Sequence, residues 1–420
     1  MRPDGVAPND RQVAYIVSPE LIAASSQLPS NKGRSTAVHT LIHAYGLSKH
    51  VKVVRPVKAS YKELAAYHTR EYLDAVLDSK RGASPGLRGG DNGEEEEFGL
   101  DSDCPPFPAL AAYVPLVAGA SLTAARALMD SVSPVHIAIC WDGGRHHAQK
   151  GAAKGFCYVA DCVLAVLALK RGPNTRKQGT GKTRVMYLDL DLHFSDAVSQ
   201  AFAGSMAKAP QILTLSIHYA APGFYPPSPL ASLPDPTSTN FDPSTLSIPL
   251  HAGAGPATLL RIWDTVENVK RTFDPDYVVL QCGVDALSGD PCAIGNWDLE
   301  SLGEVVGRVV RGWDVPVLLL GGGGYNTPNT ARAWAYLTSV ALDDPLALDA
   351  PIPDHANFPA YGPSFTLDVP KGMMQDQNSE AYLCEVEACY EAVVEVLKDR
   401  MGSGPATDAR TTVDTADTDR

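Results

Sequence analysis

The sequence lacks the closely spaced cysteine pairs of metal ribbons. Eight cysteines are spread over 420 residues, and none of them forms a CxxC pair. Cys157 and Cys162 are five positions apart, and Cys282 and Cys292 are ten apart. These spacings suit neither a zinc ribbon nor a disulfide framework. We therefore expect free thiols in a reducing compartment.

Long hydrophobic runs and a secretory signal are also missing. No run approaches the roughly 18 consecutive apolar residues of a membrane span, and residues 1–10 lack a basic segment followed by an apolar one. The net charge of −13 excludes a generic nucleic-acid binder. It suits a basic partner such as a lysine-rich protein tail, although ordinary solubility explains the charge equally well. We expect a soluble, intracellular protein.

Hydrophobic residues, in contrast, make up 45% of the chain. Short apolar runs typical of buried strands alternate with stretches of helical spacing. The predicted strands are 11–17, 51–57, 135–140, 185–190, 212–217, 277–281 and 315–320, and the predicted helices are 33–45, 61–77, 108–129, 159–169, 259–273 and 299–313. This alternation predicts one α/β domain over residues 11–400, with a central, mostly parallel sheet and helices on both faces. Residues 401–420 are polar and acidic, so we expect a disordered tail.

Polar residues and glycines follow four of the predicted strands. WDGGRHHA (141–148) comes after the strand at 135–140, and DLDLHFSD (189–196) closes the strand that begins at 185. CGVDALSGDP (282–291) and GGGGYN (321–326) follow two further strands. In parallel sheets, ligands bind beyond the carboxyl ends of the strands. The sequence therefore predicts that all four segments meet at one rim.

One of these segments carries a candidate metal site. Asp191 and His193 alternate along an extended chain, so both side chains face the same way. Carboxylate oxygen and imidazole nitrogen are zinc ligands, and Asp285 on a neighbouring strand end is the best candidate for the third. Three protein ligands leave one position open, as catalytic zinc requires. The alternative is a salt-bridged or capping cluster without metal.

Adjacent histidines form the second feature. His146 and His147 follow Gly143 and Gly144, which supply a tight turn, so both imidazoles can reach one cavity. One can act as a general base, and the other can assist electrostatically or as an acid. The remaining carboxylates of these segments, Asp189 and Asp196, are candidates to orient the two rings. A chance surface doublet is the alternative.

Glycine runs and aromatic residues complete the pattern. GGGGYN lacks the Lys-Ser/Thr of a phosphate loop, so we expect its glycines to aim Tyr325 at the site, where a phenol stabilises an oxyanion. The alternative is a packing tyrosine at a turn. Aromatic rings at 155–156 and 223–225 suit a narrow apolar tunnel for the methylene stem of a lysine. Either segment alone is more typical of a core.

Taken in order, the motifs resemble the class I histone deacetylases of the arginase/deacetylase superfamily, over about residues 11–398. The branch that they resemble most is that of the eighth human paralogue and its fungal relatives. The matching segments are GRSTAVHTLIHAYGL, DSDCP, WDGGRHHAQKGAAKGFCY, YLDLDLHFSD, VLQCGVDALSGDP, LLLGGGGYNTPNTARAW and IPDHANFPAYGP. The resemblance implies the arginase/deacetylase fold.

The resemblance also implies a role for each matching residue. Zinc, with iron(II) as the alternative, is bound by Asp191, His193 and Asp285. The implied catalytic residues are His146, His147 as general base, their partners Asp189 and Asp196, and the oxyanion-stabilising Tyr325. The implied substrate-binding residues are Asp103 at the rim, Gly155, Phe156 and Tyr225 in the tunnel wall, and Cys292 at the mouth. Structural potassium is implied near Asp189, Asp191, His193, Ser216, Ile217 and, at a second site, Phe202, and Arg34 lies beneath the site.

The implied activity is removal of acetyl groups from N6-acetyl-lysine of histones and other proteins, in chromatin and transcriptional repression. The implied partners are acetylated histone tails and a corepressor complex, without direct nucleic-acid or membrane binding. The implied location is the nucleus, with the cytoplasm as a second compartment. The alternatives are an acetylpolyamine or longer-acyl-lysine deacylase, a weakly active scaffold, and an arginase-like dimanganese enzyme, which needs more bridging ligands.

Several residues depart from the family pattern. The family usually has DLHHGDG where this chain has DLHFSDA, with Phe194 and Ser195 after the metal segment. Arg145 replaces the usual Trp or Leu before the histidine pair, Tyr225 replaces a Phe, and Cys292 replaces Leu or Met. These departures predict weak or unusual activity on standard acetyl-lysine substrates.

Overall fold

The central sheet is seen in a computed structural model that describes residues 12–79, 97–101, 103–175, 181–204 and 210–402. Eight strands lie in the order β2-β1-β3-β8-β7-β4-β5-β6, and every neighbouring pair runs parallel. The strands are β1 (Val13–Ile16), β2 (Lys52–Val54), β3 (Ile137–Cys140), β4 (Val185–Asp189), β5 (Ile212–Tyr219), β6 (Thr245–Leu250), β7 (Tyr277–Gln281) and β8 (Val317–Leu320). The predicted α/β fold with a parallel sheet is confirmed.

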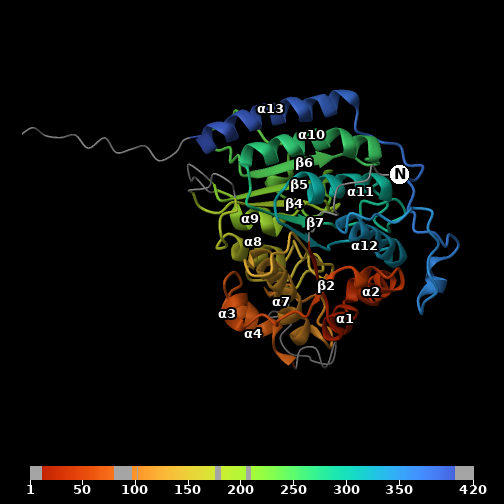
Figure 1. Ribbon diagram of the computed structural model, residues 1–420. Helices are drawn as coiled ribbons and strands as arrows, with labels where there is room; N and C mark the ends of the chain where they lie inside the picture. Colours follow the sequence, from red (N-terminus) through yellow and green to blue (C-terminus); the bar gives the residue numbers. More distant parts are fainter. Residues whose placement is uncertain (1–11, 80–96, 102, 176–180, 205–209, 403–420) are drawn as a thin grey trace, which may run out of the picture.

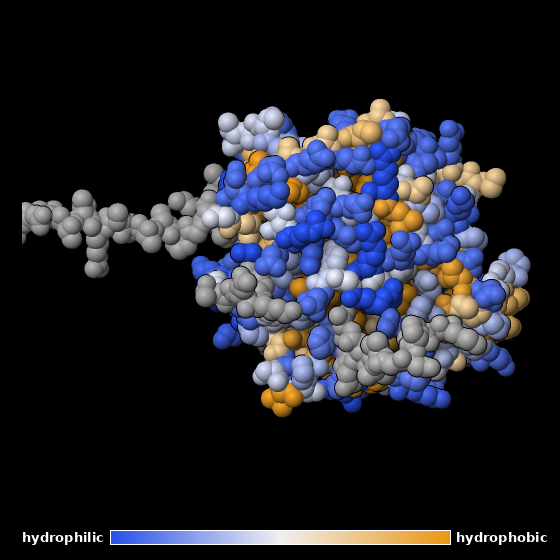
Figure 2. Space-filling model, turned by 45° about the horizontal axis from the view of Figure 1, so that its top comes forward, coloured by the Kyte–Doolittle hydropathy of each residue, from blue (hydrophilic) through white to orange (hydrophobic). Residues whose placement is uncertain are grey.

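Helices cover both faces of the sheet (Figure 1). They are α1 (Pro19–Ser25), α2 (Arg34–Ala44), α3 (Tyr61–Leu64), α4 (Arg70–Val76), α7 (Leu110–Met129), α8 (Asp161–Leu169), α9 (Asp196–Phe202), α10 (Pro256–Phe273), α11 (Leu299–Gly307), α12 (Thr327–Ala341) and α13 (Glu380–Gly402). One core forms under α2 and α10 to α13, and the other under α1, α7 and α8. The side formed by α10, α11 and α13 is turned forward in Figure 2, where hydrophilic residues predominate.

Burial on both faces explains why the strands were predictable. In β1, Val13 and Tyr15 belong to one core, whereas Ala14 and Ile16 belong to the other. A strand covered on both faces is a continuous apolar run. The predicted strand 277–281 therefore matches β7 residue for residue.

By length and composition, α7 is long and apolar enough to cross a membrane. Its apolar residues do not form one unbroken run, because residues such as Ser121 and Arg126 interrupt them. Most of the helix is buried inside the protein. It packs against α8, β1 and β3, so it is a core helix of this fold.

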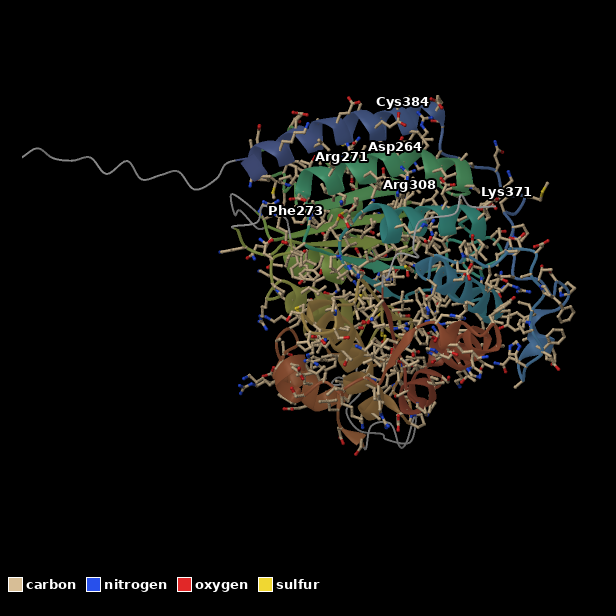
Figure 3. All side chains as sticks on the ribbon, viewed as in Figure 1. Asp264, Arg271, Phe273, Arg308, Lys371 and Cys384 are labelled. Carbon is tan, nitrogen blue, oxygen red and sulfur yellow. The ribbon has the colours of Figure 1, made fainter. Side chains whose placement is uncertain are left out.

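Two helix predictions need correction. The predicted helix 61–77 is two helices, because Ser60 caps α3 with a capping box and Thr69 caps α4 as a new N-terminus. The predicted helix 299–313 is also divided. Its first part is α11, which ends at Gly307, and its second part is a π-helical turn that begins at Arg308. Arg308 Nη2 in this turn lies 3.1 Å from Asp264 Oδ1 on α10 (Figure 3).

Other elements were not predicted at all. β6 contains Pro249, which is tolerated because β6 is an edge strand. α1, α9, α12 and α13 were also missed. At the C-terminus, α13 runs to Gly402, so the first two residues of the predicted tail 401–420 are helical. The rest of that tail lies outside the described residues, as does residue 11 of the first predicted strand.

We predict that Gly119→Ala destabilises the protein by about 1–3 kcal/mol, the usual cost of overpacking. A Cβ atom at this position would lie 2.1 Å from the carbonyl oxygen of Val57 and 2.6 Å from the nitrogen of Ala59. This backbone clash outweighs the gain in helix propensity of about 1 kcal/mol. Gly312→Ala is the matched control, since no atom lies within 4 Å of the place that its Cβ would take. Thermal unfolding that leaves both variants equal to the wild type would contradict this account.

Candidate active site

Four neighbouring strands bring the predicted polar segments to one rim. β3, β8, β7 and β4 are consecutive in the sheet, although they come from distant parts of the chain. The segments that follow them carry His146 and His147, Tyr325, Asp285, and the group Asp189, Asp191, His193 and Asp196. Contacts among these side chains, described below, place them in one site.

Two carboxylates and an imidazole converge at the ends of β4 and β7. His193 Nδ1 lies 2.9 Å from Oδ2 of Asp285 and 3.2 Å from Oδ1 of Asp191. Both carboxylates are buried, whereas the side chain of His193 keeps 15% of its exposure. The cluster is therefore closed on its carboxylate side and accessible at the imidazole.

The second oxygen of each carboxylate is bound by the surrounding fold. Oδ2 of Asp191 accepts hydrogen bonds from the backbone of Gly323 at 2.7 Å and from Nε2 of Gln281 at 2.9 Å. Oδ1 of Asp285 accepts one from the backbone of Leu192 at 2.8 Å. These bonds orient the remaining two oxygens toward the imidazole. Two oxygens and one nitrogen in this arrangement are a donor set that zinc accepts.

The cluster concentrates negative charge away from water. Burial and the charge of Asp191 raise the pKa of Asp285 to about 7. Burial also opposes ionisation of Asp191, but the charges of His146 and His193 hold its pKa well below the usual range. Burial alone would lower the pKa of His193, but the two carboxylates raise it to about 10. A cation bound here would offset the same negative charges, so the electrostatics fit a metal site.

Each histidine of the predicted pair has its own carboxylate. His146 Nδ1 lies 2.9 Å from Asp189 Oδ2, and His147 Nδ1 lies 2.8 Å from Asp196 Oδ1. The two ring centroids are 4.0 Å apart. Because Nδ1 is occupied in both rings, Nε2 is the nitrogen free for chemistry, and in His146 it lies 3.7 Å from Oδ1 of Asp191.

A tight turn makes this pairing possible. Gly144 has a φ of 89°, and a Cβ atom there would lie 2.1 Å from the carbonyl oxygen of Gly321. The carboxylate of Asp161 accepts hydrogen bonds from the backbone of Gly144 at 2.9 Å and of Arg145 at 2.7 Å. Sequence reasoning predicted the glycine turn but missed Asp161, because its position at the start of α8 gave no signal.

The two histidines have opposite electrostatic environments. Burial disfavours a charge on His146, but Asp189 and Asp191 outweigh it and raise its pKa to about 9. Burial and the positive charge of His146 lower the pKa of His147 to about 4, despite its bond with Asp196. Near neutral pH, one imidazole is charged and its neighbour is neutral, the division of labour that acid–base catalysis uses.

Lys154 is a further charged neighbour that sequence reasoning missed. Its Nζ lies 2.6 Å from Asp196 Oδ2 and 5.5 Å from the centroid of the Tyr225 ring. Gln149 Nε2 donates to the same carboxylate oxygen at 3.2 Å. The lysine thus shares Asp196 with His147, and no motif or spacing pointed to it.

The turn after β8 positions Tyr325. Its backbone nitrogen donates to Asp290 Oδ2 at 2.7 Å, and its ring centroid lies 5.8 Å from that of Phe156. Burial, followed by the charges of Asp285 and Asp191, raises the pKa of Tyr325 well above its usual value. The phenol therefore stays protonated and able to donate a hydrogen bond.

Predicted wall residues border the histidines. Gly155 has a φ of 53°, and a Cβ atom there would lie 2.6 Å both from the His147 ring and from the hydroxyl of Tyr225. The Tyr225 ring centroid is 5.1 Å from that of His147. Phe156 is 37% exposed. Asp103 is exposed, and its charge contributes to the rise in the pKa of Tyr225, of which burial is the main cause.

Other predicted residues lie around and beneath the cluster. Buried Arg34 donates to the carbonyl oxygen of Gly324 at 2.8 Å and lies over the Trp334 ring. Burial lowers the pKa of Arg34 to about 10. Ser216 is the β5 neighbour of Asp189. Ile217 is next along β5, and Phe202 ends α9.

The DLHFSDA departure is accommodated by packing. Phe194 is buried, and its ring centroid lies 4.9 Å from that of His218. Ser195 is also buried, and its hydroxyl lies 3.4 Å from that of Ser199 in α9. Asp196 still reaches His147, so the altered loop retains the histidine–carboxylate pair.

Comparison with known proteins identifies this arrangement. Residues 28–341 match the family model of the histone deacetylase domain. The chain belongs to the histone deacetylase family. It is 36% identical over 377 residues to histone deacetylase 8 of Danio rerio, covering 89% of this chain and 92% of the relative. It is 37% identical over 376 residues to histone deacetylase 8 of Xenopus tropicalis, covering 89% and 95%.

A more distant relative is histone deacetylase 19 of Arabidopsis thaliana, 32% identical over 387 residues, with 91% of this chain and 72% of the relative covered. The predicted resemblance to class I histone deacetylases is thus confirmed. This deacetylase is a hydrolytic lysine deacetylase of a metal-dependent, generally zinc-dependent, family with roles in chromatin and transcription.

We predict that Lys154→Met raises the pKa of His147. The ammonium of Lys154 offsets part of the negative charge of Asp196, so its loss strengthens the attraction of that carboxylate for a protonated imidazole. The His147 ring should then titrate at higher pH than in the wild type, as measured by NMR of labelled histidine. Lys150→Met is the matched control, since its contact with His68 is made by the backbone. An unchanged or lower His147 pKa would rule out this role for Lys154.

Proposed function

We propose that this deacetylase hydrolyses N6-acetyl-lysine side chains of proteins, with a catalytic metal bound by Asp191, His193 and Asp285. The observation that carries the proposal is the convergence of two carboxylate oxygens on Nδ1 of His193, at 2.9 and 3.2 Å. Three protein ligands leave a position open for a reactant, the arrangement of catalytic zinc sites. Mixed oxygen and nitrogen ligands suit zinc and also iron(II). When bound, the metal supplies Lewis acidity, which polarises a carbonyl and lowers the pKa of water.

The chain's own residues then divide the proton transfers. His147, kept neutral by burial and by its charged neighbour, accepts a proton from the attacking water and returns it to the leaving lysine nitrogen. His146, held in its charged form by Asp189 and Asp191, stabilises the negative charge that develops on the former carbonyl oxygen. Tyr325 donates a hydrogen bond to the same oxygen.

Substrate binding is assigned to the residues around this centre. The tunnel wall is formed by Gly155, Phe156 and Tyr225, and Asp103 binds the substrate backbone at the rim. Cys292, which the sequence placed at the mouth, instead lies beside His193 and Asp285, because its Sγ is within 4.8 Å of a ligand atom of each. Apolar rings match the methylene stem of lysine, and a net charge of −13 suits basic histone tails. The proposed partners are therefore acetylated histone tails and other acetyl-lysine proteins, together with a corepressor complex.

Supporting roles and location complete the proposal. The catalytic domain spans residues 11–400, and Arg34 supports the turn that carries Tyr325. Structural potassium binds near Asp189, Asp191, His193, Ser216 and Ile217, with a second site near Phe202. The protein acts in the nucleus, with the cytoplasm as a second compartment.

The test uses Tyr325→Phe and Asp285→Asn assayed on an acetyl-lysine peptide. Loss of the oxyanion donor should lower kcat by about 10²–10³-fold without loss of bound zinc, whereas Asp285→Asn should lose both zinc and turnover. Tyr45→Phe is the control, because the Tyr45 hydroxyl bonds the carbonyl of Pro351, at 3.2 Å, away from the site. Wild-type turnover in both site variants would contradict the proposal.

A further inference from the structure

The thiol of Cys292 lies close to two of the proposed metal ligands, His193 and Asp285. Its Sγ, a nitrogen of His193 and a carboxylate oxygen of Asp285 all lie within 4.8 Å of one another. These atoms come from two segments, the loop after β4 with His193 and the loop after β7 with Asp285 and Cys292, so the trio is a cluster made by the fold. His193 and Asp285 are also proposed metal ligands, so the thiol lies beside two of the three proposed ligands.

The thiol is held at this place by the loop after β7. The backbone nitrogen of Cys292 donates to Asp290 Oδ1 at 2.9 Å, and the other oxygen of Asp290 accepts from the backbone of Tyr325. The loop that carries Cys292 and the turn that carries Tyr325 are therefore tied to one carboxylate. Cys292 is only partly buried.

The distances among His193, Asp285 and Cys292 fit three ligands of one metal after a small movement, and Oδ1 of Asp191 lies 3.2 Å from Nδ1 of the same histidine. With zinc–sulfur bonds of about 2.3 Å and zinc–nitrogen bonds of about 2.0 Å, neighbouring ligand atoms in a tetrahedron are about 3.5 Å apart. The observed trio needs to close by roughly an ångström, which a change in one side-chain torsion supplies. Apolar Leu or Met, the usual residues at this position in the family, could not supply a thiolate.

We infer that Cys292 is a fourth protein ligand, which closes the open position of the metal in the absence of substrate. The inference rests on the proposed metal site of Asp191, His193 and Asp285. Thiolate is a favoured zinc ligand, and a closed four-ligand site is the form that structural zinc takes. The substrate carbonyl must then displace Cys292 before it can react, so Cys292 competes with substrate.

The proton balance is simple. Burial and the neighbouring carboxylates Asp285 and Asp290 raise the pKa of Cys292, so the metal-free thiol keeps its proton. Metal coordination deprotonates a thiol, and the released proton goes to solvent. When substrate displaces the sulfur, the thiol takes a proton back. No oxidant or other co-reactant is needed.

The test replaces the native metal with cobalt(II) in the full chain and records its absorption spectrum. A cobalt–thiolate bond gives a near-ultraviolet charge-transfer band, which the wild type should show and Cys292→Ser should lack. The zinc dissociation constant should rise about tenfold or more in Cys292→Ser, since even outer ligand partners contribute 10–100-fold. The KM for an acetyl-lysine peptide should fall, because the internal competitor is gone.

Controls separate this inference from the metal site itself. Cys384→Ser should keep the band, because Cys384 lies on α13 at the outside of the molecule (Figure 3). Cys292→Leu, which restores a usual family residue, serves as a second variant that has no ligand atom at this position. Wild-type protein that binds cobalt without the sulfur band would overturn the inference and leave the three-ligand site standing. Wild-type protein that binds neither cobalt nor zinc would overturn both.

Discussion

The structure depends on holding two buried carboxylates, Asp191 and Asp285, against one imidazole. Like charges in a dry interior are unfavourable unless a cation or hydrogen bonds offset them. The fold binds the outer oxygens through Gln281 and backbone nitrogens, and directs the inner ones at His193. This requires β7 to lie between β4 and β8, which is the observed sheet order. Strands that are distant in the sequence thus become neighbours in the sheet, and this brings the site residues together.

The same negative centre organises the chemistry around it. Asp189 and Asp191 keep His146 charged, and burial together with that charge keeps His147 neutral. Two adjacent, identical side chains thus have different protonation states. Lys154 contacts Asp196, the carboxylate partner of His147, and thereby influences the pKa of that histidine. Cys292 reaches the cluster from further along the loop after β7, the loop that also carries Asp285.

The sequence predicted the site better than its surroundings. Strands such as β7 were predictable because burial on both faces leaves an uninterrupted apolar run, and their polar ends supplied the candidate ligands. The break at Ser60 and Thr69 was missed, because local capping overrides helical periodicity. β6 was missed because a proline, here Pro249, argues against a strand in a sequence. As an edge strand, β6 nevertheless tolerates it. Lys154 and Gln281 were missed because their roles depend on loop paths and strand order that spacing does not encode.

The central claim is that Asp191, His193 and Asp285 bind one catalytic metal. The most direct test is anomalous diffraction at the zinc absorption edge from crystals of active, zinc-loaded protein. The account predicts a single peak about 2.0–2.2 Å from Nδ1 of His193 and from one oxygen of each aspartate. A peak elsewhere, or none at this position in active protein, would contradict it.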